Sequence, residues 1–288
     1  MYALIANPKA GNQQEFDRKK KILNKVANRL KIPVFGLDSK NKTEFQQLAK
    51  SLSNNNEILI VAGGDGTFSD VLNSGLNPQV TLAYLPLGSG NALRYGLELL
   101  TSMEKWYARF QRNQVKELDV ILYNDSYRCF FSGFGFEAQV MQDRQTMRQK
   151  GFDGFLAYGI PIAKGIISRH PRFNAFINVD GVQHIVENIL TISLAKHPFY
   201  GYGIKANPYA RWDDGLIHTR PITESTFAVG WRILYAFYGT LTPQTYFPGK
   251  TISITTDTAH PIQCDGEFMG SASTATFTIL PKCIKVIC

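Results

Sequence analysis

The clearest chemical signal in the 288-residue chain is the glycine-rich run at residues 61–67, Val-Ala-Gly-Gly-Asp-Gly-Thr. It follows an apolar segment typical of a β-strand and precedes a short helical pattern. Glycines let the backbone approach a phosphate closely, and the N–H groups at a helix start point toward the anion. A carboxylate there would repel a phosphate unless a cation or a transferable proton lay between them, so Asp65 predicts Mg²⁺ binding or acid–base chemistry. The run predicts a site for nucleotide phosphates.

Two further loops have the same character. Residues 7–11 (Asn-Pro-Lys-Ala-Gly) follow the first expected strand, and residues 85–91 (Leu-Pro-Leu-Gly-Ser-Gly-Asn) follow another. One glycine loop is weak evidence, because strand ends often need glycine for turning. Three such loops at the carboxyl ends of parallel strands would converge on one edge of a sheet. The GxxxxGK[ST] phosphate loop and the protein-kinase motif set are not found in this sequence, so the nucleotide must be held in another way.

The first part of the chain alternates strand and helix patterns. Strands are expected at 2–6, 33–36, 58–62 and 81–85, and helices at 14–30, 42–52 and 67–74. This order predicts an α/β domain with a doubly wound parallel sheet and a ligand at the carboxyl ends of its strands.

From about residue 118 the composition changes to β-branched and aromatic runs separated by turn residues. Strands are expected at 128–134, 174–179, 188–194, 216–220, 251–256 and 274–280, and helices near 152–168 and 224–238. These runs favour an antiparallel sheet or sandwich, with a domain boundary near 118–122.

The amino-acid composition restricts the classes of binding partner that we expect. The formal charge is +8, and most of the excess lies before residue 119, which suits nucleotides, acidic lipid headgroups or nucleic acid. The simplest interpretation of the basic stripe on the helix at 14–30 is an ordinary solvated face. The alternative is a surface that makes weak peripheral contact with a membrane. Four cysteines without CxxC spacing and five scattered histidines argue against zinc. No membrane-spanning or leader segment is evident, so we expect a cytoplasmic location, extending to the inner membrane surface.

Six ordered segments resemble motifs of the diacylglycerol kinase catalytic-domain family, which includes bacterial lipid kinases and sphingosine kinases. They are the three loops above and residues 133–138 (GFGFEA), 207–216 (NPYARWDDGL) and 264–267 (CDGE). Together they extend over most of the chain, which makes the resemblance specific. In the segment at 133–138, Glu137 stands in place of the usual aspartate.

The resemblance implies two domains: a nucleotide-binding domain similar to those of phosphofructokinase and NAD kinase at 1–120, and a β-sandwich that binds the lipid substrate at 121–283. Residues 284–288 are expected to return to the first domain. ATP and the lipid hydroxyl would meet in the cleft between the domains.

The resemblance also implies the nucleotide contacts. They are Asn7, Pro8, Lys9, Ala10, Gly11, Ser39, Gly63, Gly64, Asp65, Gly66, Thr67, Phe68, Ser69, Asp70, Gly88, Ser89 and Asn91. Ser39 aligns only approximately with a threonine that contacts ATP. Ser89 replaces a threonine but keeps the hydroxyl, whereas Asp70 replaces a glutamate and shortens the reach.

Phosphoryl transfer needs neutralised phosphates, an in-line acceptor and a base for its proton. Asp65, Asp265 and Glu267 are assigned to this work. By the resemblance the glutamate is a proton acceptor, and Asp65 lies near Mg²⁺ and the phosphates. On a strand, Asp265 and Glu267 would face one side; if Gly266 marks a turn, they would separate. Asp-Gly is also an ordinary hairpin signal.

A structural Mg²⁺ site is implied at residues 211–216. The ligands would be the Asp214 carboxylate and the backbone carbonyls of Arg211 and Leu216, an all-oxygen set that suits a hard cation. Taken alone, the Asp-Asp-Gly sequence is also an ordinary turn.

The sequence thus predicts an ATP- and Mg²⁺-dependent lipid kinase that phosphorylates a hydroxyl of a lipid such as diacylglycerol at a membrane surface. The alternatives are an NAD or sugar kinase of the same superfamily and a non-catalytic nucleotide-binding regulator. Nucleic acid is not expected as a partner, and a homodimer is one oligomeric state left open. The acceptor's tail would lie in residues 122–270, whose aromatic side chains are also ordinary core residues.

Overall fold

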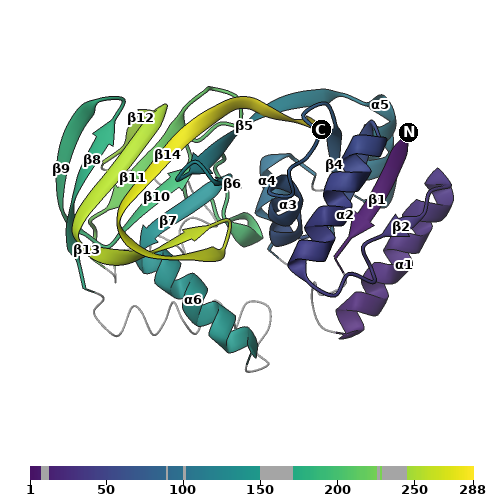
Figure 1. Ribbon diagram of the computed structural model, residues 1–288, viewed down its shortest axis with the longest axis horizontal. Coiled ribbons are helices and arrows are strands. Elements are labelled where there is room, and N and C mark those ends of the chain that lie inside the picture. The colour runs from purple at the N-terminus through teal and green to yellow at the C-terminus, as the bar shows by residue number, and fades with distance from the viewer. Residues whose placement is uncertain (8–12, 89, 100–101, 150–170, 226–227, 229–244) are drawn as a thin grey trace. The chain divides into compact units, whose positions relative to one another are not determined.

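The computed structural model describes residues 1–7, 13–88, 90–99, 102–149, 171–225, 228 and 245–288 (Figure 1). The chain divides into two compact units. Unit 1 comprises Met1–Leu118 and Lys282–Cys288, and unit 2 comprises Asp119–Pro281. The helices expected near 152–168 and 224–238 lie almost wholly outside the described residues.

Unit 1 alternates strands and helices. Its elements are β1 (Tyr2–Ala6), α1 (Gln13–Leu30), β2 (Val34–Phe35), α2 (Lys42–Asn55), β3 (Ile58–Gly63), α3 (Asp65–Leu72), β4 (Thr81–Pro86), α4 (Ala92–Gly96) and α5 (Met103–Arg112). The strands are parallel in the order β2-β1-β3-β4, and residues 285–287 of β14 (Glu267–Ile287) pair beside β4. The doubly wound sheet expected from the sequence is confirmed.

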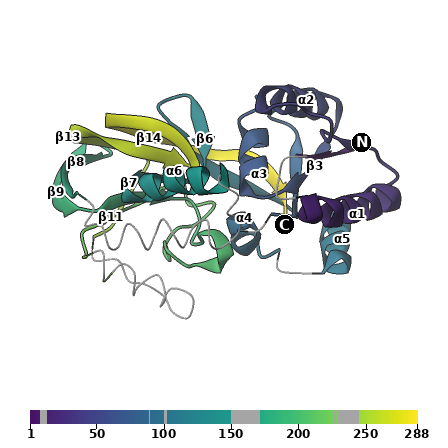
Figure 2. The ribbon, with the colours of Figure 1, turned by 90° about the horizontal axis from the view of Figure 1, so that it is seen from below.

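Helices cover both faces of this sheet, and Figure 2 shows α2 and α1 on opposite sides of it. On one face, Leu23 and Val26 of α1 and Trp106 of α5 join a core with alternate residues of the strands. On the other, Phe45 of α2 and Phe68 of α3 are buried. Since both faces are covered, every residue of β3 is buried, and its near-continuous apolar run follows from that.

Unit 2 is built mainly from antiparallel strands. Its elements are β5 (Val115–Tyr123, which begins in unit 1), β6 (Tyr127–Cys129), β7 (Phe131–Gly135), α6 (Phe136–Gln149), β8 (Phe173–Val179), β9 (Val182–Ile189), β10 (Thr191–Ala195), a 3₁₀ turn (Gly201–Gly203), β11 (Ile217–Ile222), β12 (Phe247–Gly249), β13 (Thr251–Cys264) and β14. The helix α6 and the strand β5 were not expected from the sequence.

The long strand β13 links two sets of strands in unit 2. Residues 252–256 pair with β8, whereas residues 262–264 pair with β7, and the register with β14 shifts between these stretches. Such irregularities let one strand pass between the two layers of a sandwich. In β8 buried residues alternate with more exposed ones, as expected for a strand with one face on a core. The antiparallel sandwich expected for this part of the chain is confirmed.

Candidate functional site

The strand order of unit 1 marks one edge of the sheet as the ligand-binding edge. The chain leaves β1 toward β2 on one side and leaves β3 toward β4 on the other. Ligands of doubly wound sheets bind where the strand order reverses in this way, at the carboxyl ends. Asn7 and Gly64 follow β1 and β3 at this edge, and Gly88 follows β4. The loop residues Pro8, Lys9, Ala10 and Gly11, together with Ser89, lie outside the described residues.

The loops after β3 and β4 are in direct backbone contact. The Gly63 carbonyl accepts from the N–H groups of Leu87, at 2.8 Å, and Gly88, at 3.2 Å. A Cβ placed on Gly88 would lie 2.4 Å from the Gly64 Cα. Real side chains cannot approach a backbone so closely, so this contact requires glycine.

Asp65 joins the same two loops through its side chain. Its Oδ2 accepts from the N–H of Ala92 at 2.8 Å, and its Oδ1 accepts from the N–H of Leu93 at 3.0 Å. These N–H groups open α4 and have no partner within that helix. The Asp65 carboxylate therefore caps α4 and links the loop after β3 to the segment after β4.

Asn91 completes this arrangement. Its backbone is left-handed, with φ of 43°, and the residue is buried, with 4% of its surface exposed. Its Nδ2 donates to the Gly88 carbonyl at 2.6 Å, and its Oδ1 accepts from the Tyr84 hydroxyl at 3.1 Å. Burial raises the pKa of Tyr84, with the Asp65 charge acting in the same direction, so this hydroxyl stays a donor.

The N-terminus of α3 is the part of this edge suited to an anion. The helix begins at Asp65, two residues before the expected start, and its N-cap is Gly64, which has no side-chain oxygen to cap it. Gly66 is exposed, and a Cβ built on it meets no described atom within 4 Å. Backbone N–H groups at an open helix start bind phosphate readily.

Five other residues expected at the nucleotide have side chains that are buried or paired within unit 1. Thr67, Phe68 and Ser69 are buried, and Phe68 packs edge-to-face on Tyr84. Asp70 forms an ion pair with Lys42 of α2 at 3.0 Å. Ser39 is buried in a turn where its N–H donates to the Gly36 carbonyl. The side chains of Phe68 and Asp70 therefore contact β4 and α2.

The acidic pair in unit 2 stands at a tight hairpin. Cys264 pairs with Glu267 across β13 and β14, which leaves Asp265 and Gly266 as a two-residue turn with φ of 49° and 84°. Positive φ at both positions is typical of a type I′ turn and explains the Asp-Gly sequence. Of the two arrangements expected, the structure therefore shows the turn.

This turn separates the two carboxylates. Asp265 Oδ1 accepts from the N–H groups of Phe130 and Phe131, at 3.1 and 2.9 Å, so it holds the hairpin to the chain between β6 and β7. Glu267 is exposed instead.

Glu137 of the GFGFEA segment is a further candidate that the sequence did not assign to the site. It lies in the first turn of α6, and its Oε2 would be 2.7 Å from a Cβ on Gly133. Burial raises the pKa of Glu137 to about 7, against the opposing effects of Tyr200 and Arg220. A carboxyl that titrates near neutrality is a candidate functional group. The signals in the sequence that could have identified Glu137 were its carboxyl group and its position in the GFGFEA motif.

The Mg²⁺ site expected at Arg211, Asp214 and Leu216 does not fit the structure. The Lys196 ammonium donates to Asp214 Oδ1 at 2.8 Å and to the Leu216 carbonyl at 2.7 Å. Two of the three expected ligand atoms are therefore bound to a side-chain cation. Lys196 stands outside the motif that predicted the metal, so sequence reasoning missed it.

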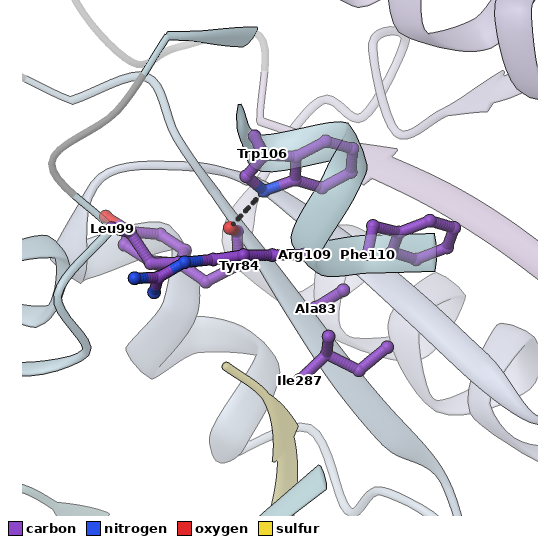
Figure 3. Close-up of a pocket in the computed structure, with 7 residues that line it drawn as sticks. All are labelled: Ala83, Tyr84, Leu99, Trp106, Arg109, Phe110 and Ile287. Carbon is purple, nitrogen blue, oxygen red and sulfur yellow. Dashed lines mark hydrogen bonds between the residues drawn. The ribbon is translucent and has the colours of Figure 1, made fainter. Parts of the chain in front are cut away.

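Searches of the described residues add two negative findings and one small pocket. Among these residues we find no cluster of three or more His, Cys, Asp or Glu side chains suited to a metal, and no helix long and apolar enough to cross a membrane. The pocket drawn in Figure 3 lies between β4, α5 and the end of β14, where Trp106 Nε1 donates to the Tyr84 carbonyl at 2.9 Å. Its volume of about 10 Å³ holds about one water, so it is a packing void.

A doubly wound α/β unit together with an antiparallel β-sandwich is the architecture of the NAD kinase-like fold. Residues 1–123 match the model described as "Diacylglycerol kinase catalytic domain", and residues 132–288 match "YegS C-terminal NAD kinase beta sandwich-like domain". The chain belongs to the diacylglycerol kinase catalytic-domain family.

Individual relatives agree with this assignment. The chain is 25% identical over 305 residues to an uncharacterised protein of Synechocystis, covering 98% of this chain and 69% of that protein. It is 25% identical to a Staphylococcus aureus protein named "Putative lipid kinase SAB0675c", covering 83% and 79%.

Two solved structures share the fold. One is titled as a "putative diacylglycerol kinase" from Bacillus anthracis, with a TM-score of 0.79 and 21% identity over 99% of this chain and 96% of that one. The other is an NAD kinase from Archaeoglobus fulgidus in complex with ATP, with a TM-score of 0.54 and 13% identity over 100% and 94%.

Proposed function

We propose that this protein is an ATP-dependent lipid kinase that transfers the γ-phosphoryl group to a hydroxyl of a lipid such as diacylglycerol. The observation that carries the proposal is the construction of the strand-end site in unit 1. There Asp65 ties two glycine loops together beside the open N-terminus of α3. The family assignment and the names of the relatives support a lipid acceptor, and the ATP complex of the NAD kinase supports ATP as the donor.

In this proposal unit 1 binds the phosphates of ATP. The N–H groups at the start of α3 hold the phosphate oxygens, and Gly66 leaves room for them because it carries no side chain. A carboxylate at this position, such as that of Asp65, suits Mg²⁺, which would neutralise phosphate charge when bound. Asn7 follows β1 at the same strand ends and is another expected nucleotide contact, as are residues 8–11, which lie outside the described residues.

Unit 2 supplies the acceptor side of the reaction, and Glu267 is the proposed base. Asp265 is occupied by two backbone N–H groups, whereas Glu267 is exposed beside it. In the transfer, the lipid hydroxyl oxygen forms a bond to the γ-phosphorus and the bond to the β–γ bridging oxygen breaks. The hydroxyl proton passes to the Glu267 carboxylate, and ADP leaves.

The decisive assay is transfer of radiolabelled phosphate from ATP across a lipid panel in micelles. The panel contains diacylglycerol, sphingosine, ceramide and phosphatidylglycerol, with NAD as a separate acceptor. Wild-type protein should label at least one lipid, and Glu267→Gln should lower that rate by roughly 10²–10⁴-fold, as expected for loss of a general base. The matched control is Glu187→Gln on exposed β9, which should keep the wild-type rate. If Glu267→Gln transfers phosphate at the wild-type rate, Glu267 is not the base. If NAD is labelled and no lipid is, the protein is an NAD kinase and the proposed lipid kinase activity is wrong.

A further inference from the structure

A buried lysine in unit 2 lies where a structural metal ion was expected. Lys196 directly follows β10, and its side chain is 0% exposed. Lysine is almost never fully buried unless its charge is compensated. The contacts of Nζ therefore identify the groups that compensate this buried charge.

The ammonium has three N–H donors and three oxygen partners. They are Asp214 Oδ1 at 2.8 Å, the Leu216 carbonyl at 2.7 Å and Asp119 Oδ2 at 3.0 Å. Each donor has an acceptor, as a buried ammonium needs. Two carboxylates and one backbone carbonyl form an all-oxygen set of the kind that binds hard divalent cations.

The same oxygens also bind neighbouring backbone groups. Asp119 Oδ2 accepts from the Gly215 N–H at 2.7 Å, and the Asp119 N–H donates to the Trp212 carbonyl at 2.8 Å. Asp214 Oδ1 accepts from the Leu216 N–H at 3.2 Å. The turn at 212–216 is thus held to β5 through a cluster with one positive charge at its centre.

His218 and Tyr246 complete the surroundings of Asp214. His218 Nε2 lies 2.8 Å from Asp214 Oδ2, and its Nδ1 contacts the Tyr246 hydroxyl. Since an ionised carboxylate can only accept, the contact with Asp214 is satisfied by the tautomer in which Nε2 carries the ring proton and Nδ1 accepts from Tyr246. The second carboxylate oxygen of Asp214 is therefore also bound to a protein group.

We propose that the Lys196 ammonium takes the place of a divalent cation in this cluster, so that unit 2 needs no metal ion here. A divalent ion within bonding distance of Asp214 and Leu216 would lie against the ammonium and be repelled by it. Removal of the ammonium should expose a latent cation site made of the Asp119, Asp214 and Leu216 oxygens. This inference is independent of the proposed reaction, because it concerns the stability and metal binding of the unloaded protein.

Thermal unfolding of the full chain tests the first half of the proposal. Wild type should have the same melting temperature in excess Mg²⁺ and in excess EDTA. Any Mg²⁺-dependent shift that is also seen in Asp214→Asn arises at another site and is subtracted. In EDTA, Lys196→Ala should melt roughly 10 °C lower, because the buried Asp119 and the partly buried Asp214 lose their counter-charge. Excess Mg²⁺ or Ca²⁺ should restore much of that loss. The matched control is Lys282→Ala, which removes an exposed lysine 3.9 Å from Glu117 and should change the melting temperature little.

Terbium luminescence tests the second half, because Trp212 lies beside the cluster and can sensitise a bound Tb³⁺ ion. The signal is defined as the emission that Asp214→Asn abolishes. It should be absent from wild type, present in Lys196→Ala and absent again in the double variant with Asp214→Asn.

Three results would overturn the proposal. They are an Asp214-dependent Tb³⁺ signal in wild type, a Lys196→Ala protein that melts like wild type in EDTA, and a destabilised Lys196→Ala protein that binds no cation at Asp214. If Lys196→Ala does not fold, the wild-type measurements still decide the first of these. Lys196→Arg, which keeps the charge, should then fold and show no metal response.

Discussion

Asp65 in unit 1 and Asp265 in unit 2 perform the same structural task in different surroundings. Each lies in a glycine-containing motif, and each carboxylate accepts two backbone N–H groups from a segment distant in sequence, at 92–93 and at 130–131. Beside Asp65 the neighbouring group is the open start of a helix, whereas beside Asp265 it is the exposed carboxylate of Glu267. Each aspartate therefore fixes the backbone of its motif, whereas the group beside it is the one assigned to the proposed reaction.

The largest test of this comparison is Asp65→Asn. The amide keeps the size of the side chain but presents an NH₂ group to one of the N–H donors of α4. We expect transfer activity to fall by roughly 100-fold, since the two glycine loops lose their link, and the free energy of unfolding to fall by about 2 kcal/mol. Activity assays and urea unfolding measure the two effects. Wild-type activity in this variant would show that the link is dispensable.

Asp265→Asn is the matched change in unit 2. It leaves Glu267 in place and disturbs the backbone N–H contacts at 130–131. The free energy of unfolding should fall by about 2 kcal/mol, as for Asp65→Asn, but transfer activity should fall less than in Glu267→Gln. If Asp265→Asn lost as much activity as Glu267→Gln and kept its stability, Asp265 would be the base. Its role would then not be limited to holding the backbone.

A pH measurement tests Glu137. Its pKa in the folded protein is about 7 against an ordinary value of 4.5. Because the folded state holds the proton more tightly, its contribution to stability is fully present below pH 4.5 and is lost as pH rises through 7. Urea unfolding across this window should show a decrease of roughly 2–3 kcal/mol in wild type. Glu137→Gln should remove that decrease and Glu187→Gln should keep it; a pH dependence that survives Glu137→Gln would assign it to another group.

The smallest expected effect concerns the exposed basic face of α1. The double variant Lys21→Glu/Lys25→Glu should weaken binding to anionic vesicles severalfold at low salt, and less at high salt, because surface charges are screened. Arg29 is left unchanged, because its guanidinium lies over the Tyr107 ring at 4.1 Å and serves packing. The exposed Lys250→Glu variant is the control from unit 2. Unchanged vesicle binding by the double variant would leave α1 as an ordinary solvated helix.

Local patterns were sufficient for much of the fold. The strands β1, β3 and β4 were expected within one residue of their observed bounds, because long buried apolar runs have few other structures open to them. The short helix α4 and the helix α5 were missed. α4 is only five residues long, and it depends on the Asp65 carboxylate, 27 residues earlier, for its cap.

For the site, the sequence determined which residue types were present and in what order. The glycine loops, Asp65, the Asp-Gly turn and Glu267 all follow from local chemistry, since a backbone that must turn or approach another backbone needs glycine wherever it lies.

Only the tertiary structure decided how each charged group is used. It committed Asp265 to backbone N–H groups, left Glu267 exposed, and brought Lys196 from the end of β10 into the oxygens of Asp119, Asp214 and Leu216. The physical reason is that a buried charge is compensated by whichever opposite charge or dipole the fold brings within about 3 Å, and that partner can be far away in sequence.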